Sequence, residues 1–259
     1  MFGFNKKLLL MGILNVTPDS FSDGGKYFKI EDAIKQAKKL ISQGVDIVDI
    51  GGESTRPGAK AVSEEEELNR IIPVIKRCRD VARNVSTRRI LISIDTYKSN
   101  VAQLALIAGA DMINDVSGLT MDAEMVHVAA KAKCPIVIMH NNGIPATKPC
   151  RGVWPYAPTD VIQKIYRWLK KQTNFAISNG IKQENIIIDP GIGFGKTPEE
   201  DLALIENLKE FKSLGFPILV GTSRKSFIKK LFGKENFERK NKEITELAIK
   251  NGADVVRVH

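Results

Sequence analysis

Short apolar segments alternate with longer segments of helical spacing along the whole chain of 259 residues. The first of these segments lacks the polar alternation of a half-exposed strand, which is typical of a strand buried on both faces of a parallel sheet. These segments lie at residues 8–14, 45–50, 90–94, 112–113, 136–139, 186–188, 218–220 and 254–258. Such strands, with no linker or repeat boundary between them, predict one α/β domain over residues 1–259, a (β/α)8 TIM barrel.

The segments between these strands carry helix signals. Residues 31–43 have apolar side chains at helical spacing and end at Gly44, and Ser63 with Glu66 forms a capping box that opens the next helix. Helices are predicted at residues 31–43, 63–82, 101–108, 123–133, 159–178 and 199–214, with one or two basic helices between 224 and 251.

Composition excludes several classes of protein. No run of about 18 apolar residues exists in the sequence, so we expect no membrane-spanning helix. The apolar run after Lys6 and Lys7 leads into a polar loop rather than a cleavage site, which argues against export. Three widely spaced cysteines, Cys78, Cys134 and Cys150, predict reduced thiols and a cytoplasmic location.

The formal net charge of +9 is concentrated near the end of the chain. Residues 224–250 hold nine basic and four acidic residues and contain no recognisable nucleic-acid-binding motif. We expect most of this segment to be a solvated, lysine-rich surface that attracts small anions. The predicted partners are therefore small-molecule substrates, with no nucleic acid and no membrane.

Polar side chains follow nearly every predicted strand. In a closed parallel barrel the carboxyl ends of the strands converge on one face, which is where catalytic groups are found. The residues expected to meet there are Asn15, Thr55, Arg56, Asp95, Asn114, Asp189, Lys225, Arg257 and His259. Each one alone could cap a helix or fill a turn. Caps do not, however, require an arginine, a lysine, a histidine and two aspartates on one rim.

The basic side chains of this set are suited to an anion. Arg56, Arg257 and His259 offer hydrogen-bond donors that match phosphate oxygens. Asn15 supplies a neutral oxygen suited to Mg²⁺, which takes few protein ligands and fills its octahedron with water and substrate phosphate.

The acceptors of the set are suited to a flat heterocycle. Asp95, Asn114 and Asp189 could accept N–H groups of a ring, while Lys225 could donate to a ring carbonyl or nitrogen. Together with the anion-binding residues, these side chains predict a heteroaromatic substrate that bears a phosphate or pyrophosphate.

The residues at the strand ends lie in longer motifs. The motifs are MGILNVTPDSFSDGG at 11–25, GGESTRPG at 51–58, SIDT at 93–96, IND at 113–115, DPGIGFGK at 189–196, SRKS at 223–226 and RVH at 257–259. In sequence and order they resemble the dihydropteroate synthases, a family of pterin-binding barrel enzymes of folate biosynthesis. The resemblance covers nearly the whole chain, and the first motif is long enough to be diagnostic alone.

The resemblance implies a transferase. The amine of 4-aminobenzoate would attack the exocyclic methylene of 6-hydroxymethyl-7,8-dihydropterin diphosphate, giving 7,8-dihydropteroate and pyrophosphate without a side-chain nucleophile. The implied pterin contacts are Asp95, Asn114, Asp189 and Lys225, and the implied pyrophosphate contacts are Thr55, Arg257 and His259. Asn15 would bind Mg²⁺. The implied aminobenzoate pocket, the target of sulfonamides in this family, is shaped by Phe21, Arg56, Pro57 and Ser226.

The chain also departs from the family pattern. The segment after the fifth strand reads His140-Asn141-Asn142-Gly143 where the family has His-Met-Gln-Gly, and the sequence stops at His259 where the family continues into an eighth helix. With the eighth helix missing, we expect the outer faces of the last and first strands to be exposed to solvent. The chain alone would then be marginally stable and weakly active, and a homodimer or another partner would cover the gap. Alternatively, residues 227–250 fold back over it.

Two other functions fit parts of the sequence. One is a truncated, weakly active or inactive pterin-binding relic. The other is a barrel like the methyltetrahydrofolate–corrinoid methyltransferases, whose reaction needs no pyrophosphate site. Asn15, Arg257 and His259 argue against this second alternative because they predict such a site.

Overall fold

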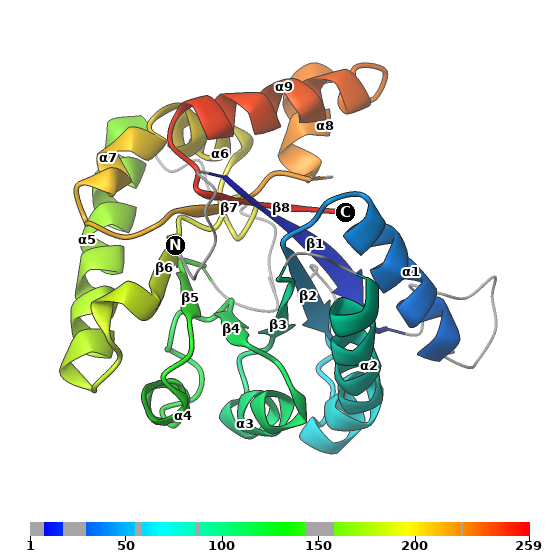
Figure 1. Cartoon of the computed structure of the whole chain (residues 1–259). Helices are drawn as coiled ribbons and strands as arrows, with labels where there is room; N and C mark the ends of the chain where they lie inside the picture. Colours follow the sequence, from blue (N-terminus) through cyan, green and yellow to red (C-terminus); the bar gives the residue numbers. More distant parts are fainter. Residues whose placement is uncertain (1–7, 18–29, 55–58, 86–88, 143–157, 224) are drawn as a thin grey trace.

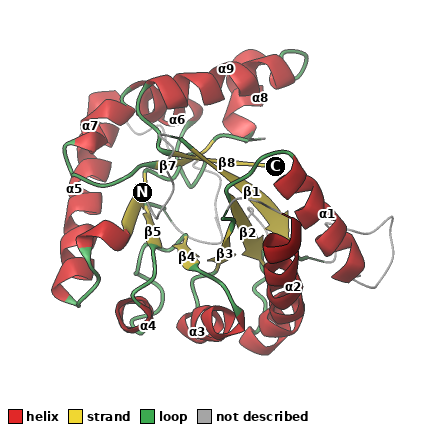
Figure 2. Ribbon diagram, viewed as in Figure 1, coloured by secondary structure: helices red, strands yellow, loops and turns green. Residues whose placement is uncertain are grey.

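The computed structural model describes residues 8–17, 30–54, 59–85, 89–142, 158–223 and 225–259. The strands are β1 (Leu9–Asn15), β2 (Ile47–Gly51), β3 (Leu91–Asp95), β4 (Met112–Asp115), β5 (Ile136–Met139), β6 (Ile186–Asp189), β7 (Leu219–Gly221) and β8 (Val255–Val258). They form one parallel sheet in the order β6-β5-β4-β3-β2-β1-β8-β7, and a bridge between Ile188 and Ile218 brings its two edges together. The predicted (β/α)8 barrel is confirmed (Figures 1 and 2).

The helices lie outside the ring of strands (Figure 2). They are α1 (Ile30–Ser42), α2 (Glu64–Val85), α3 (Ser99–Ala108), α4 (Met125–Ala132), α5 (Pro158–Ser178), α6 (Pro198–Glu206), α7 (Leu208–Lys212), α8 (Ser226–Phe232) and α9 (Phe237–Lys250). The helix predicted at 199–214 is divided at Asn207, whose side-chain amide donates to the Ala203 carbonyl at 2.8 Å. The backbone N–H of Asn207 donates to the same carbonyl at 3.1 Å, and the backbone of Asn207, with φ of −112° and ψ of 24°, departs from the helical conformation at this point.

The floor of the barrel is a separate apolar cluster. It is formed by every strand of the sheet, through Leu9, Met11, Ile47, Leu91, Met112, Val137, Ile187, Leu219 and Val255. Because side chains of a strand alternate between its faces, the residues two positions later point into the same interior. Those residues include Asp49, Ser93, Asn114, Asp189 and Arg257. The interior thus changes from apolar to polar toward the carboxyl ends of the strands.

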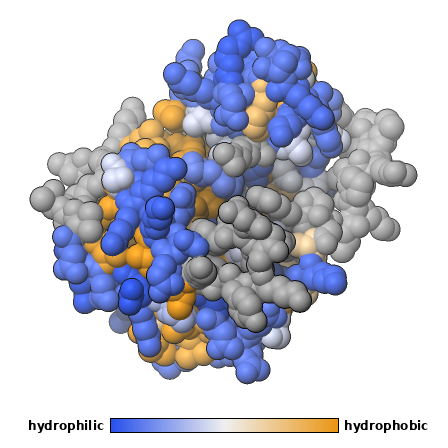
Figure 3. Space-filling view, turned by 90° about the vertical axis from the view of Figure 1, so that its right-hand side faces the viewer, coloured by the Kyte–Doolittle hydropathy of each residue, from blue (hydrophilic) through white to orange (hydrophobic). Residues whose placement is uncertain are grey.

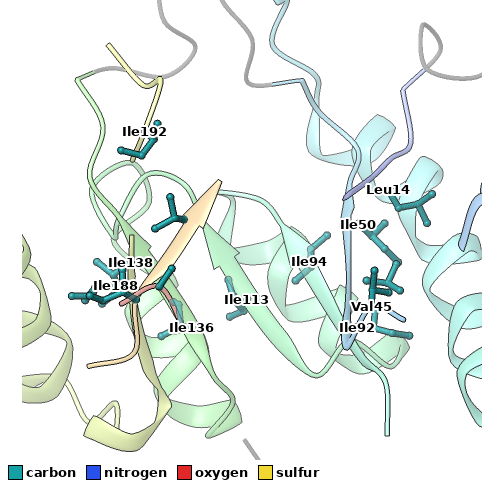
Figure 4. Packing of buried hydrophobic residues seen from close by; sticks show 14 of the residues in the cluster. Leu14, Val45, Ile50, Ile92, Ile94, Ile113, Ile136, Ile138, Ile188 and Ile192 are labelled. Atoms are coloured by element: carbon teal, nitrogen blue, oxygen red, sulfur yellow. The ribbon is translucent and has the colours of Figure 1, made fainter. Parts of the chain in front are cut away.

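The outer faces of the strands pack against the helices. Their side chains belong to one large buried cluster, and Figure 4 shows Ile50, Ile92, Ile94, Ile113 and Ile138 within it. Branched aliphatic side chains are stiff and fit the pleated surface of a sheet. This packing holds the strands in register, and the register places the polar residues at the other end of the barrel.

A repeated Gly-x-Asp device connects three helices to the strands that follow them. Asp46, Asp111 and Asp254 each stand two residues after a glycine of positive φ, with φ of 98°, 118° and 108° at Gly44, Gly109 and Gly252. Each aspartate accepts a backbone N–H from the neighbouring strand or its start, from Leu10 at 3.0 Å, Ile92 at 2.8 Å and Ile218 at 2.8 Å. These carboxylates are therefore structural groups at the end of the barrel opposite the site.

The expectation of an exposed seam at β1 and β8 is wrong for two of its residues. Leu14 and Val256 have exposed fractions of 1% and 0%. Leu14 belongs to the outer cluster with α1, and the adjacent Gly12 lies against Leu40, 3.0 Å from where its Cβ would be. A residue without a side chain lets the helix approach, and the helix then covers β1. Leu8, Leu10 and Val258 on this face are half-buried.

The surface of α8 and α9 is largely polar, and hydrophilic residues cover the upper part of the molecule in Figure 3, where these helices lie. Lys229, Lys230, Lys234 and Lys242 are exposed. No helix among the described residues has the length and apolar character needed to cross a bilayer. Cys78 and Cys134 are buried thiols without a disulfide, and Cys150 lies outside the described residues.

Candidate active site

The carboxyl ends of the strands bring the predicted residues together. In the parallel register Asn15 pairs with Gly51, Gly51 with Asp95, and Asp95 with Asn114, so these positions lie side by side across β1 to β4. On the other side of the ring, Gly221 pairs with Arg257. Asn15 is half-buried, whereas Asp95 and Asn114 are buried.

Arg257 is held by two carboxylates inside the barrel mouth. Its Nε donates to Asp49 Oδ2 at 2.6 Å, and its Nη2 donates to Asp95 Oδ2, also at 2.6 Å. Burial alone would lower the pKa of Arg257, but the charges of Asp49 and Asp95 raise it. The guanidinium is therefore a permanent cation that links β8 to β2 and β3.

Asp95 has an unusual environment for a carboxylate. Burial raises its pKa to about 7, an effect that Arg257 opposes and the nearby Asp49 increases. Two carboxylates near one guanidinium repel each other, and an additional N–H donor would relieve this repulsion. Asp95 is thus prepared to accept a hydrogen bond from a ligand.

Asp49 is a site residue that the sequence analysis missed. It is fully buried, and its Oδ2 accepts from Asn114 Nδ2 at 3.0 Å as well as from Arg257. A signal for it exists, because Asp49 is a charged residue inside an otherwise apolar strand, two positions after the interior residue Ile47. Strand periodicity alone would have placed it in the barrel interior.

Asp189 and Lys225 lie on the opposite side of the mouth. Asp189 Oδ1 accepts from the Gly191 backbone at 2.7 Å, and burial raises the pKa of Asp189 to about 6 against the effects of this bond and of Lys225. Burial lowers the pKa of Lys225 to about 8, although Asp189 opposes this shift. Lys225 Nζ also lies 4.5 Å from the centre of the Phe194 ring, a residue the sequence analysis did not single out.

The turn after β6 requires glycine. Gly191 has φ of +72°, and a Cβ there would lie 1.8 Å from the carbonyl oxygen of His140. The Lys196 ammonium donates to the Gly191 carbonyl at 2.6 Å from inside the same turn. This close packing fixes the backbone N–H that binds Asp189, so the turn sets the orientation of that carboxylate.

The remaining predicted residues are distributed at the rim or lie outside the described residues. His259 is exposed, and its Nδ1 lies 3.2 Å from Ser223 Oγ. Ser226 is exposed at the start of α8. Phe21, Thr55, Arg56 and Pro57 lie outside the described residues.

A buried ion-pair network lies beside the site and was not predicted. Lys98 donates to Glu53 Oε2 at 2.5 Å and to Glu67 Oε2 at 2.6 Å. Glu53 also accepts the backbone N–H of Val62 at 3.2 Å, and Lys98 donates to the Val62 carbonyl at 2.7 Å. The network therefore joins the two described ends of the segment that contains Thr55, Arg56 and Pro57.

A cavity of about 780 Å³ lies beside the barrel mouth rather than in it. It is lined by residues after β5, on α5 and after β6, including His140, Lys164 and Lys196. In the chain, residues 143–157, which the structure does not describe, connect two of its walls. We therefore place the site at the converging strand ends, where the acceptors and cations meet.

A magnesium site of several protein ligands is not present among the described residues, because no three His, Cys, Asp or Glu side chains are grouped to hold a metal. Asn15 offers one amide oxygen at the carboxyl end of β1. Mg²⁺ commonly takes only one or two protein ligands when a substrate phosphate and water supply the others. Asn15 fits this second kind of site.

These features define a class of protein: a parallel barrel enzyme whose mouth, at the carboxyl ends of the strands, gathers buried carboxylates, an amide and fixed cations. The chain belongs to the pterin-binding enzyme family, whose model matches residues 11–259. It is 46% identical to the dihydropteroate synthase of Synechocystis over 262 residues, which cover all of this chain and 87% of that enzyme.

Solved structures agree with this membership. The dihydropteroate synthase of Xanthomonas albilineans, solved with 4-aminobenzoic acid, is 41% identical, has a TM-score of 0.85 and covers 98% of this chain and 88% of its own. The enzyme of Anaplasma phagocytophilum, solved with bound 6-hydroxymethylpterin monophosphate, is 34% identical, has a TM-score of 0.86 and covers 98% and 94%. Neither a degenerate relic nor a corrinoid methyltransferase is favoured by these relatives.

Proposed function

We propose that this chain is a dihydropteroate synthase that joins 4-aminobenzoate to 6-hydroxymethyl-7,8-dihydropterin diphosphate in folate biosynthesis. The products are 7,8-dihydropteroate and pyrophosphate. The observation that carries the proposal is the convergence of Asp95, Asn114, Asp189 and Arg257 in one barrel mouth, in a chain whose relatives along its full length are dihydropteroate synthases.

The pterin ring is proposed to bind among Asp95, Asn114, Asp189 and Lys225. The carboxylates and the amide oxygen accept ring N–H groups, and Lys225 donates to a ring carbonyl or nitrogen. The buried setting of both aspartates supports this role, since an unpaired polar group there costs about 1–3 kcal/mol that a correct ligand removes.

The diphosphate is proposed to bind Arg257, His259 and Thr55. Arg257 carries a permanent charge within the mouth. His259 lies at the rim, two residues after Arg257 and directly after the end of β8. Negative charge increases on the diphosphate as its bond to the methylene breaks, so fixed donors at this position stabilise the transition state.

The reaction requires no side-chain nucleophile. The amine nitrogen of 4-aminobenzoate forms a bond to the exocyclic methylene, the methylene–oxygen bond breaks, and the pair of electrons leaves with pyrophosphate. The amine then loses a proton. The protein binds both substrates so that nitrogen and methylene lie close together, which removes much of the entropic barrier of a bimolecular step.

The aminobenzoate pocket is proposed to include Phe21, Arg56, Pro57 and Ser226. Only Ser226 lies within the described residues, where it is exposed at the start of α8, next in sequence to the pterin residue Lys225. This adjacency supports a pocket beside the pterin. Such a pocket would also bind sulfonamides.

Magnesium is proposed as the cofactor, with Asn15 as its protein ligand and the substrate diphosphate as the other main ligand. When bound, the ion would neutralise charge on the leaving group. Asn15 supports this role through its place at the carboxyl end of β1, on the same level as Asp95.

A cytoplasmic location is proposed, supported by the reduced thiols Cys78 and Cys134. A homodimer, or a partner that covers the outer face of β8 and β1, is also proposed. The half-buried Leu10 and Val258 on that face support it. Sedimentation of the purified chain as a monomer at all concentrations would contradict the homodimer.

The function is tested by measuring both products. Purified protein mixed with 4-aminobenzoate and the dihydropterin diphosphate should release pyrophosphate and dihydropteroate in equal amounts. Omission of either substrate should stop both. Pyrophosphate release that does not depend on 4-aminobenzoate would contradict the proposal.

A further inference from the structure

We propose that Asp49 is a positioning residue of the active site, which holds Arg257 for the diphosphate and orients the amide of Asn114 for the pterin. This inference rests on the proposed function and extends it to Asp49, which the proposed function does not involve. Asp49 itself is expected to touch neither substrate. It acts through the two residues that do.

The geometry gives Asp49 two partners on one oxygen. Its Oδ2 accepts from Arg257 Nε at 2.6 Å and from Asn114 Nδ2 at 3.0 Å. These partners come from β8 and β4, on either side of β2 in the ring. One fully buried carboxylate therefore fixes side chains that belong to different strands and, in the proposed function, to different parts of one substrate.

Stability does not explain a carboxylate at this position. The exposed fraction of Asp49 is 0%, its neighbours in the strand are aliphatic, and its Oδ1 has no hydrogen-bond partner in the described part of the structure. A buried ion pair is often no more stable than aliphatic side chains of similar size. An incompletely bonded carboxylate is even less favourable. A functional demand is the better explanation for the charge.

The two carboxylates that bind Arg257 have different roles. Asp95 holds Nη2, but the proposed function requires Asp95 to accept a ring N–H. Asp49 holds Nε, which lies at the base of the guanidinium. When the pterin engages Asp95, the bond to Asp49 retains the guanidinium in the mouth, and the Nη groups are available to phosphate oxygens.

Asn114 is oriented by the same carboxylate. An amide has a donor side and an acceptor side, and Asp49 can accept only from the donor side. With the Nδ2 of Asn114 bound to Asp49, the Oδ1 of Asn114 is directed away from Asp49 and can accept from other groups. In the proposed site those groups are ring N–H groups of the pterin, so Asp49 selects the amide orientation that recognises the pterin.

The experiment compares Asp49→Asn and Asp49→Leu with Asp46→Asn. Asp46 is a matched control because it is a buried aspartate next to the same strand. Its carboxylate binds the Leu10 backbone, not a substrate-binding residue. Kinetic constants for each substrate, inhibition by inorganic pyrophosphate and the melting temperature are measured for every variant and for the wild-type chain.

Asp49→Asn is expected to raise the KM for the pterin diphosphate and to weaken pyrophosphate inhibition by about tenfold or more, the effect of losing a charge-assisted bond. The KM for 4-aminobenzoate should change much less. Asp49→Leu should raise the KM for the pterin diphosphate, and weaken pyrophosphate inhibition, more than Asp49→Asn does. Asp46→Asn should lower the melting temperature and leave the pterin KM unchanged.

A double-mutant cycle with Arg257→Gln shows whether Asp49 acts through Arg257. In the Arg257→Gln background, Asp49→Asn should weaken pyrophosphate inhibition clearly less than in the wild-type background, because coupled residues are not additive. Additive effects would overturn the inference, as would an Asp49→Asn variant with wild-type constants. A wild-type chain that makes no dihydropteroate would instead overturn the proposed function. If Asp49→Leu fails to fold, the nearly isosteric Asp49→Asn decides.

Discussion

Glu53 and Lys98 form a buried ion pair, with 2.5 Å between Oε2 and Nζ. Both side chains also bind the backbone of Val62, nine residues after Glu53. Burial raises the pKa of Glu67, the second carboxylate on Lys98, although Lys98 opposes that shift. One ammonium thus neutralises two buried carboxylates and holds together the ends of the segment that carries Thr55 and Arg56.

Replacing Lys98 should destabilise the fold. Lys98→Met leaves Glu53 and Glu67 without their cation, and loss of one partner of a buried pair costs about 3–5 kcal/mol. Urea unfolding should show this decrease in the free energy of unfolding. Lys182→Met is the control, because Lys182 pairs with Glu184 at the surface and should lose less than about 1 kcal/mol. Similar losses in the free energy of unfolding for both variants would contradict the role of Lys98 as the cation of a buried ion-pair network.

The shifted carboxylates predict opposite pH dependences for binding and stability. Burial raises the pKa of Asp95 to about 7 and of Asp189 to about 6, so both ionise as the pH rises through this range. An ionised carboxylate accepts a ring N–H more strongly, so the affinity for a dihydropterin should increase between about pH 5 and pH 8.

The sign is reversed for folding. The carboxyl pKa values are higher in the folded chain than the unfolded value of about 3.9, so the unfolded chain binds fewer protons between about pH 4 and pH 7. These groups therefore lower the stability as the pH rises through that window. Calorimetric titrations and urea unfolding at matched pH values check both trends. Asp189→Asn should reduce the pH dependence of the dihydropterin affinity and that of the free energy of unfolding. A dihydropterin affinity independent of pH would be inconsistent with these roles.

The turn after β6 should not tolerate a side chain at Gly191. A Cβ there would meet the His140 carbonyl oxygen at 1.8 Å and would require φ of +72° in a residue that disfavours it. Gly191→Ala should lower the free energy of unfolding by more than about 2 kcal/mol and weaken pterin binding through Asp189.

Gly180→Ala separates backbone strain from collision at this turn. Gly180 also has positive φ, at +93°, but its Cβ would meet only Ala130 at an ordinary 3.7 Å. It should therefore lose about 1–2 kcal/mol and bind the pterin normally. A larger loss in Gly180→Ala than in Gly191→Ala would show that the collision is absent.

Magnesium binding should depend on the substrate diphosphate. Asn15 is a single neutral ligand, so calorimetry should detect weak Mg²⁺ binding to the protein alone and stronger binding in the presence of pyrophosphate. Asn15→Ala should weaken Mg²⁺ binding, most clearly in the presence of pyrophosphate. A titration of Mg²⁺ into pyrophosphate alone corrects for their direct association. Tight binding to the protein without pyrophosphate would rule out this arrangement.

Much of the fold was predictable because the outer faces of the strands, and their inner faces at the floor of the barrel, are apolar. The apolar runs therefore located the strands, and the polar residues after them located Asp95, Asn114, Asp189 and Arg257 in one mouth. Asp46 and Asp49 show the limit of this reasoning. They lie three residues apart in one short segment, yet one binds the Leu10 backbone at the closed end and the other binds Arg257.

The unpredicted contacts join residues that are distant in sequence. Lys98 meets Glu53 and Glu67 only because β2, β3 and α2 are packed together, and no local pattern marks such a pairing. The division of the helix at Asn207 reflects the non-helical backbone of that residue, which the spacing of apolar side chains does not reveal. The exposed seam was overestimated because Gly12, which allows α1 to approach β1, has no side chain to signal that contact.

The central claim is that the converging strand ends bind the pterin, and calorimetric titration of the dihydropterin diphosphate tests it most directly. The wild-type chain should bind it, and Asp189→Ala should bind it about tenfold or more weakly, because a buried ring donor loses its acceptor. Asp111→Ala removes a structural aspartate at the opposite end of the barrel and should keep the wild-type Kd. Equal affinities for wild type and Asp189→Ala would contradict the claim.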